Sequence, residues 1–74
     1  MFPNEPTTIY VRLLDEGTDV WRPVRAERVG DLFRLLGPML PDERWEFEPG
    51  TVVRVQDQHL SEGFEMVAVE AVPT

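Results

Sequence analysis

The sequence predicts a small, mostly β domain: an antiparallel barrel or sandwich of five to six strands, about the size of an SH3-like or OB-like domain. Three observations predict it. The chain has 74 residues, enough for one domain. Short β-type segments alternate with turn signals along it. No long amphipathic helix interrupts them, and the one short helical alternative lies within residues 29–36. We expect residues 1–6 to form an extended arm and residues 73–74 a frayed end.

Six segments are the predicted strands: residues 7–14, 19–28, 32–36, 45–48, 51–57 and 64–72. The first alternates in its side-chain directions, so Ile9, Val11 and Leu13 share one face. A turn around Gly17 leads to the second, which contains Pro23. Because proline cannot donate a ladder hydrogen bond, the second strand is expected to lie at an edge or to carry a bulge.

The third segment is open between helix and strand. Apolar residues within 29–36 fit helical spacing, and Gly37 would end a helix well. The turn pair Gly30 and Asp31, however, leaves only a short piece of chain behind it. We therefore favour a hairpin turn at this pair and a strand over residues 32–36.

The fourth segment alternates between aromatic and acidic side chains. Trp45 and Phe47 are expected to face the core, where their burial stabilises a domain this small. Glu46 and Glu48 are expected to point into solvent from the other face of the strand. Between the last two strands, residues 58–63 are predicted to form a turn or loop.

The charge balance limits the classes of partner. The chain has 14 acidic residues and 7 basic residues, and its net charge is −7. Phosphate backbones and anionic membrane surfaces attract clustered cations, so direct binding to nucleic acid or to a membrane is not expected. A basic protein partner is favoured, with a nucleic-acid-binding protein as one such partner, because opposite charge steers the encounter.

Cysteine is absent and histidine occurs once. We therefore expect no disulfide, no zinc site, and no other metal or cofactor. The first residues lack the features of a signal peptide, and no apolar run approaches the ~20 residues of a membrane span. The expected compartment is the cytoplasm, and the expected state is a monomer or a homodimer.

Two acidic clusters and one tryptophan are the candidates for partner binding. The residues are Asp15, Glu16, Asp19, Trp21, Asp42, Glu43, Glu46 and Glu48. The cluster around Gly17 could hold Ca²⁺, but it lacks the EF-hand pattern, and a solvated hairpin tip explains it as well. For Trp21, core packing is favoured over a role as a contact hot spot at an edge strand.

His59 and Ser61, two residues apart, are a candidate catalytic pair. A nucleophilic serine needs a base, a third group that orients the base, and an oxyanion hole. The segment around these two residues is predicted to be an exposed turn, which provides none of that support. We therefore expect that the protein is not an enzyme.

Two motifs resemble small uncharacterised bacterial proteins that are short, β-rich single domains. The first is the sequence GTDVWRPV over residues 17–24, and the second is WEF over residues 45–47, followed by Pro49 and Gly50. The resemblance covers about residues 7–70. It implies a β-barrel-like fold and a strand over residues 32–36, and it implies no activity and no catalytic residue.

Two classes of function follow as hypotheses. In the first, the chain is a non-catalytic acidic interaction protein that blocks a basic, nucleic-acid-handling partner, as an anti-CRISPR-type or immunity-type inhibitor or a nucleic-acid mimic would. In the alternative, it is a small structural or adaptor barrel that binds a peptide by an edge strand near Trp21 and Pro23, and it is acidic only for solubility.

Overall fold

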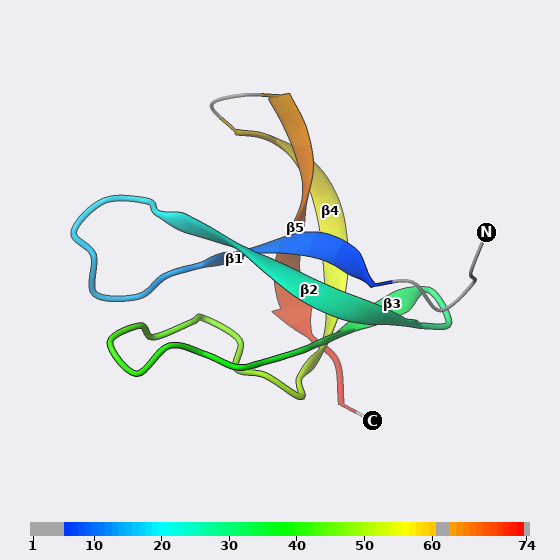
Figure 1. The fold of residues 1–74 in the computed structure, drawn as a ribbon. Coiled ribbons are helices and arrows are strands. Elements are labelled where there is room, and N and C mark those ends of the chain that lie inside the picture. The colour runs from blue at the N-terminus through cyan, green and yellow to red at the C-terminus, as the bar shows by residue number, and fades with distance from the viewer. Residues whose placement is uncertain (1–5, 61–62, 74) are drawn as a thin grey trace.

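A computed structural model describes residues 6–60 and 63–73. Its strands are β1 (Thr7–Arg12), β2 (Trp21–Val29), β3 (Leu32–Leu35), β4 (Val52–Leu60) and β5 (Gly63–Ala71). They form a closed barrel in which the order in space follows the order in sequence (Figure 1). The prediction of a small, mostly β barrel is confirmed, whereas the sandwich alternative is wrong because one sheet closes on itself.

The barrel departs from the expected antiparallel order where it closes. Successive strands pair antiparallel, but β1 and β5 pair parallel through Tyr10↔Val67. In an up-and-down barrel each strand reverses the direction of the one before it. The first and the fifth strands therefore run the same way, and an odd number of strands requires a parallel closing pair.

The first half of the chain folds largely as predicted. The helical alternative within residues 29–36 is wrong, since a turn at Gly30 and Asp31 connects β2 to β3. The edge position of Pro23 is confirmed, because β3 pairs with β2 only from Ala26 onward. In the described chain, the half of β2 that contains Pro23 therefore pairs with β1 on one side and has no paired strand on the other.

The predicted strand over residues 45–48 is wrong. Trp45 makes an isolated bridge with Leu13, and the chain then bends. Pro49 follows, which has no N–H to donate, and Gly50 adopts a φ of 92° in the turn before β4. These two residues turn the chain before a second ladder pair can form.

The predicted turn or loop over residues 58–63 is wrong for residues 58–60 and 63, which lie in strands, and residues 61 and 62 lie outside the described residues. β4 continues to Leu60 and β5 begins at Gly63, so the two strands form a long hairpin that projects beyond the barrel (Figure 1). The polar sequence of this stretch fits a projecting hairpin, which has little of its surface inside the core. Ser61, one half of the catalytic pair considered above, lies outside the described residues.

The core fills the barrel and includes the predicted shared face of Ile9, Val11 and Leu13. Ile9 and Val11 are fully buried. The cluster consists of Ile9, Val11, Leu13, Val24, Ala26, Phe33, Leu35, Trp45, Val53 and Ala68. In the part of the chain that the structure describes, no helix has the length and apolar character needed to cross a membrane.

One neighbouring pair on β5 shows that apolar packing also occurs outside the barrel. Val67 and Ala68 are 1% and 2% exposed. Consecutive residues of a strand point to opposite faces, and Ala68 belongs to the core cluster. Val67 is therefore buried on the outer face, where β5 meets β1 at Tyr10.

Candidate partner-binding surface

The two predicted acidic clusters lie on two loops that meet at one end of the barrel. These loops span residues 13–20 and 36–51 and lie side by side in Figure 1. The Leu14 N–H donates to the Arg44 carbonyl at 2.7 Å, and the Glu46 N–H donates to the Arg12 carbonyl at 2.9 Å. The fold therefore joins both clusters into one surface, which we call the loop end.

Arginines neutralise three of the predicted acids. Asp15 pairs with Arg44 at 2.9 Å, Asp19 with Arg12 at 3.1 Å, and Glu43 with Arg22 at 2.7 Å. The first two pairs are largely exposed, and pairs of that kind contribute only about 0–1 kcal/mol each. Within the described residues, no ion pair is found for the remaining predicted acids, which are exposed: Glu16, Asp42, Glu46 and Glu48.

Glu43 is partly buried, unlike the other predicted acids, which are exposed. Its side chain is 15% exposed. It accepts hydrogen bonds from Arg22 Nε and from the indole Nε1 of Trp45, both at 3.1 Å. Both hydrogen bonds lower the pKa of the Glu43 carboxyl because they stabilise its charged form, and the bond from Arg22 has the larger effect. Glu43 thus ties β2 to the second loop.

The alternation predicted around Trp45 is correct in its faces even though the segment is not a strand. Trp45 is buried in the core, and Phe47 packs against it partly buried. Glu46 and Glu48 are exposed. The two acids therefore point away from a backbone that Trp45 fixes, as expected, but the regular spacing of a strand does not apply to them.

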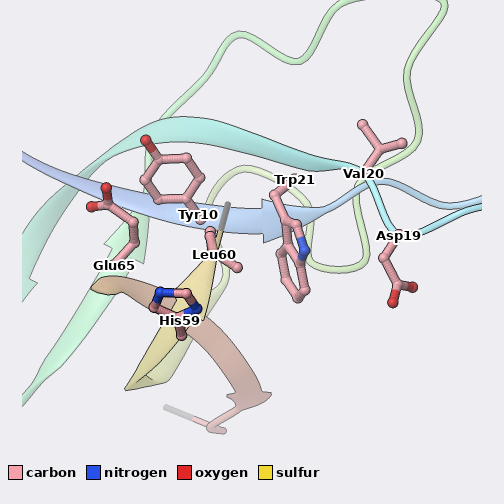
Figure 2. Close-up of a pocket in the computed structure, with 7 residues that line it drawn as sticks. All are labelled: Tyr10, Asp19, Val20, Trp21, His59, Leu60 and Glu65. Carbon is pink, nitrogen blue, oxygen red and sulfur yellow. The ribbon is translucent and has the colours of Figure 1, made fainter. Parts of the chain in front are cut away.

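Trp21, the remaining predicted residue, lies together with Asp19 in a groove on the outer face of the barrel. The groove has a volume of about 510 Å³. Its lining residues are Tyr10, Asp19, Val20, Trp21, His59, Leu60 and Glu65 (Figure 2). Trp21 is half-buried and does not belong to the core cluster, so the core role favoured from the sequence is wrong.

Strand register explains why these side chains meet. Tyr10 lies between the inward-facing Ile9 and Val11, so it points outward. Its partner Val67 shares that outer face, and Glu65 shares it too because it lies two residues before Val67. Figure 2 shows the carboxylates of Glu65 and Asp19 at opposite ends of the group, with the aromatic side chains between them.

Sequence reasoning missed five of the residues that line this groove: Tyr10, Val20, His59, Leu60 and Glu65. Alternation along β1 places Tyr10 on the face opposite Ile9 and Val11, and this was a usable signal. His59, Leu60 and Glu65 come from the β4–β5 hairpin, whose position depends on the closing pair Tyr10↔Val67. No local pattern in the sequence specifies that pair.

The groove offers aromatic and acidic side chains to a ligand. No group of three or more histidine, cysteine or acidic side chains within residues 6–60 and 63–73 could hold a metal ion. His59 stacks edge-on against Phe64, with ring centroids 5.2 Å apart. Aromatic faces beside carboxylates are groups that attract cations. Comparison of the chain with protein-family models, with curated proteins and with solved structures finds no match in any of the three.

Proposed function

We propose that the protein is a non-catalytic, acidic interaction protein that binds and blocks a basic protein partner. The observation that carries this proposal is the pair of exposed carboxylates of Glu46 and Glu48 at the loop end. A basic surface built to hold nucleic acid would accept such carboxylates in place of phosphates. A nucleic-acid-handling protein is therefore the proposed class of partner.

The backbone beneath these carboxylates is fixed before any partner arrives. Trp45 is 5% exposed, and the Glu46 N–H is bonded to the Arg12 carbonyl of β1. On the other side, the Gly50 N–H donates to the Leu35 carbonyl at 2.8 Å. A charged surface that is already ordered loses less conformational entropy on binding than a flexible acidic tail does.

Charge reversal at the loop end tests the proposal. The double variant E46K/E48K is compared with D31K/D57K, which changes the net charge equally at exposed positions outside both acidic loops. Each protein is used to capture partners from a bacterial lysate at ~0.1 M and ~0.5 M salt, over which the Debye length falls from about 10 Å toward 4 Å.

We expect a nucleic-acid-handling protein to be captured at the lower salt, retained by D31K/D57K, and lost with E46K/E48K. The proposal fails if the captured protein is retained equally at both salt concentrations. It also fails if both double variants lose the partner to the same extent, since net charge and not the loop end would then be responsible.

An open strand edge favours the adaptor alternative, at a different place from the one predicted. β3 pairs with β4 through Val52 and Val53, so among the described residues the stretch 54–60 of β4 has no strand beside it on that side. An extended peptide could add there. A partner that is insensitive to E46K/E48K and that protects the amides of residues 54–60 from hydrogen exchange would support this function instead.

A further inference from the structure

The groove around Tyr10 and Trp21 is built by strands and not by a surface loop alone. β1 and β5 pair at Tyr10↔Val67. Beyond that pair the β4–β5 hairpin projects away from the barrel, while β1 and β2 continue toward the loop end (Figure 1). The groove of about 510 Å³ occupies the angle between them. Ligand sites in proteins have volumes of about 300–1,000 Å³.

Apolar side chains line the middle of the groove without serving the core. Tyr10, Trp21 and Leu60 are each partly exposed, and none belongs to the buried cluster. Aromatic side chains that are left open to water in a concave site are frequent anchors for a partner. Figure 2 shows the rings of Tyr10 and Trp21 on either side of Leu60.

The charges of the groove define the ligand. Its lining includes the carboxylates of Asp19 and Glu65 and no arginine. Glu65 is half-buried, and no ion pair is found for it within the described part of the chain. Asp19 pairs with Arg12 from outside the groove, but both side chains are well exposed, so that pair can exchange with an incoming cation.

We propose that this groove binds the arginine side chain of an extended, basic peptide segment. A guanidinium stacks on aromatic faces and donates two hydrogen bonds to one carboxylate, which matches Tyr10, Trp21 and Glu65. A nucleic-acid backbone does not fit, because both ends of the groove are acidic. The site goes beyond the loop end, and it stands whether or not Glu46 and Glu48 bind a partner.

The two tryptophans provide the measurement. Each gives one indole N–H signal in a proton–nitrogen NMR spectrum; Trp21 reports on the groove, and Trp45 reports on the core behind the loop end. The probe is a blocked tripeptide with arginine between two leucines. The control is the same tripeptide with citrulline, which keeps the shape of arginine without its charge.

We expect the arginine peptide to shift the Trp21 indole signal and the amides around Glu65, and to leave the Trp45 indole signal in place. The citrulline peptide should bind much more weakly. E65Q removes the carboxylate that would pair with the guanidinium, and W21A removes the ring on which it would stack, so each should weaken the arginine peptide by about tenfold. In W21A the undisturbed Trp45 signal shows that the fold is intact, and the shifts of residues 63–66 report binding.

The double variant E46K/E48K separates the two sites. It should change the affinity of the arginine peptide by no more than about twofold, or ~0.4 kcal/mol, because Glu46 and Glu48 do not line the groove. Equal binding of the citrulline peptide overturns the proposal. So does an arginine peptide whose shifts fall on residues 46–48 and on Trp45, because the loop end would then be its site.

Discussion

Trp45 and Trp21 lie in neighbouring regions of the molecule and differ in what their surroundings leave free. Trp45 is 5% exposed, and its indole N–H donates to Glu43, whose carboxylate is also held by Arg22. Trp21 is half-buried on the outer face, where the half-buried Glu65 shares its groove. An aromatic residue beside a carboxylate is therefore structural at one place and available to a ligand at the other. The two places share their residue types. They differ in whether the carboxylate already has hydrogen-bond and ion-pair partners.

Truncating the two tryptophans is the strongest test of this contrast. Trp45→Ala removes a buried ring and should lower the free energy of unfolding by about 3–5 kcal/mol. Trp21→Ala removes a half-buried ring outside the core and should cost about 1 kcal/mol. Urea unfolding followed by circular dichroism measures both. If W45A does not fold, Trp45→Phe should still lower the midpoint more than Trp21→Phe does. Equal losses would remove the distinction between core and groove.

Acid titration should reveal the carboxylate that is already occupied. Hydrogen bonds lower the pKa of Glu43 in the folded state, so its charged form stabilises the fold above the ordinary glutamate pKa of about 4.3, and this stability is lost as the pH falls through that range and below it. Glu43→Gln should therefore flatten the fall of the urea midpoint between about pH 6 and pH 3.

The control for that titration is the parent protein measured over the same pH range. An E43Q midpoint that falls with pH as steeply as the parent midpoint would contradict the structural role given to Glu43.

The smallest effect is expected at the exposed pair between Asp15 and Arg44. Their side chains are 67% and 74% exposed, so a double-mutant cycle with alanine should give a coupling of about 0–1 kcal/mol, decreasing with added salt. The same cycle on Arg22 and Glu43 should give the larger coupling, since the Glu43 side chain is 15% exposed. A coupling at Asp15 that exceeds the one at Glu43 would contradict the structural role given to Glu43.

Alternation along the chain predicted burial better than it predicted strands. It correctly predicted that Ile9, Val11 and Leu13 share one face, and all three are buried. Over residues 45–48 it again gave the correct faces, but that stretch has one ladder partner and then bends. Burial depends on which way a side chain points. A strand also needs a neighbouring backbone, and the sequence pattern of one segment does not contain that neighbour.

The groove could not be predicted for a related reason. Its walls come from the start of β2, from the outer face of β1 and from the β4–β5 hairpin. In that hairpin, residues 58–63 were expected to be a turn or loop. Their meeting depends on a single register, Tyr10↔Val67, between the first and the last strand. Of the candidate site, the sequence supplied Asp19 and Trp21 as separate residues, and the fold supplied the reason that they belong with Glu65.

That register has a mechanical consequence. Between β1 and β2 the pairs run without a break from Thr7↔Ala26 to Arg12↔Trp21, whereas in the described chain β1 and β5 share one pair. The junction of β1 with β5 therefore has fewer paired residues than any other strand pair of the described barrel. An arginine peptide bound as proposed would contact Tyr10 of β1 and Glu65 of β5, so its binding would stabilise the junction at which the barrel closes.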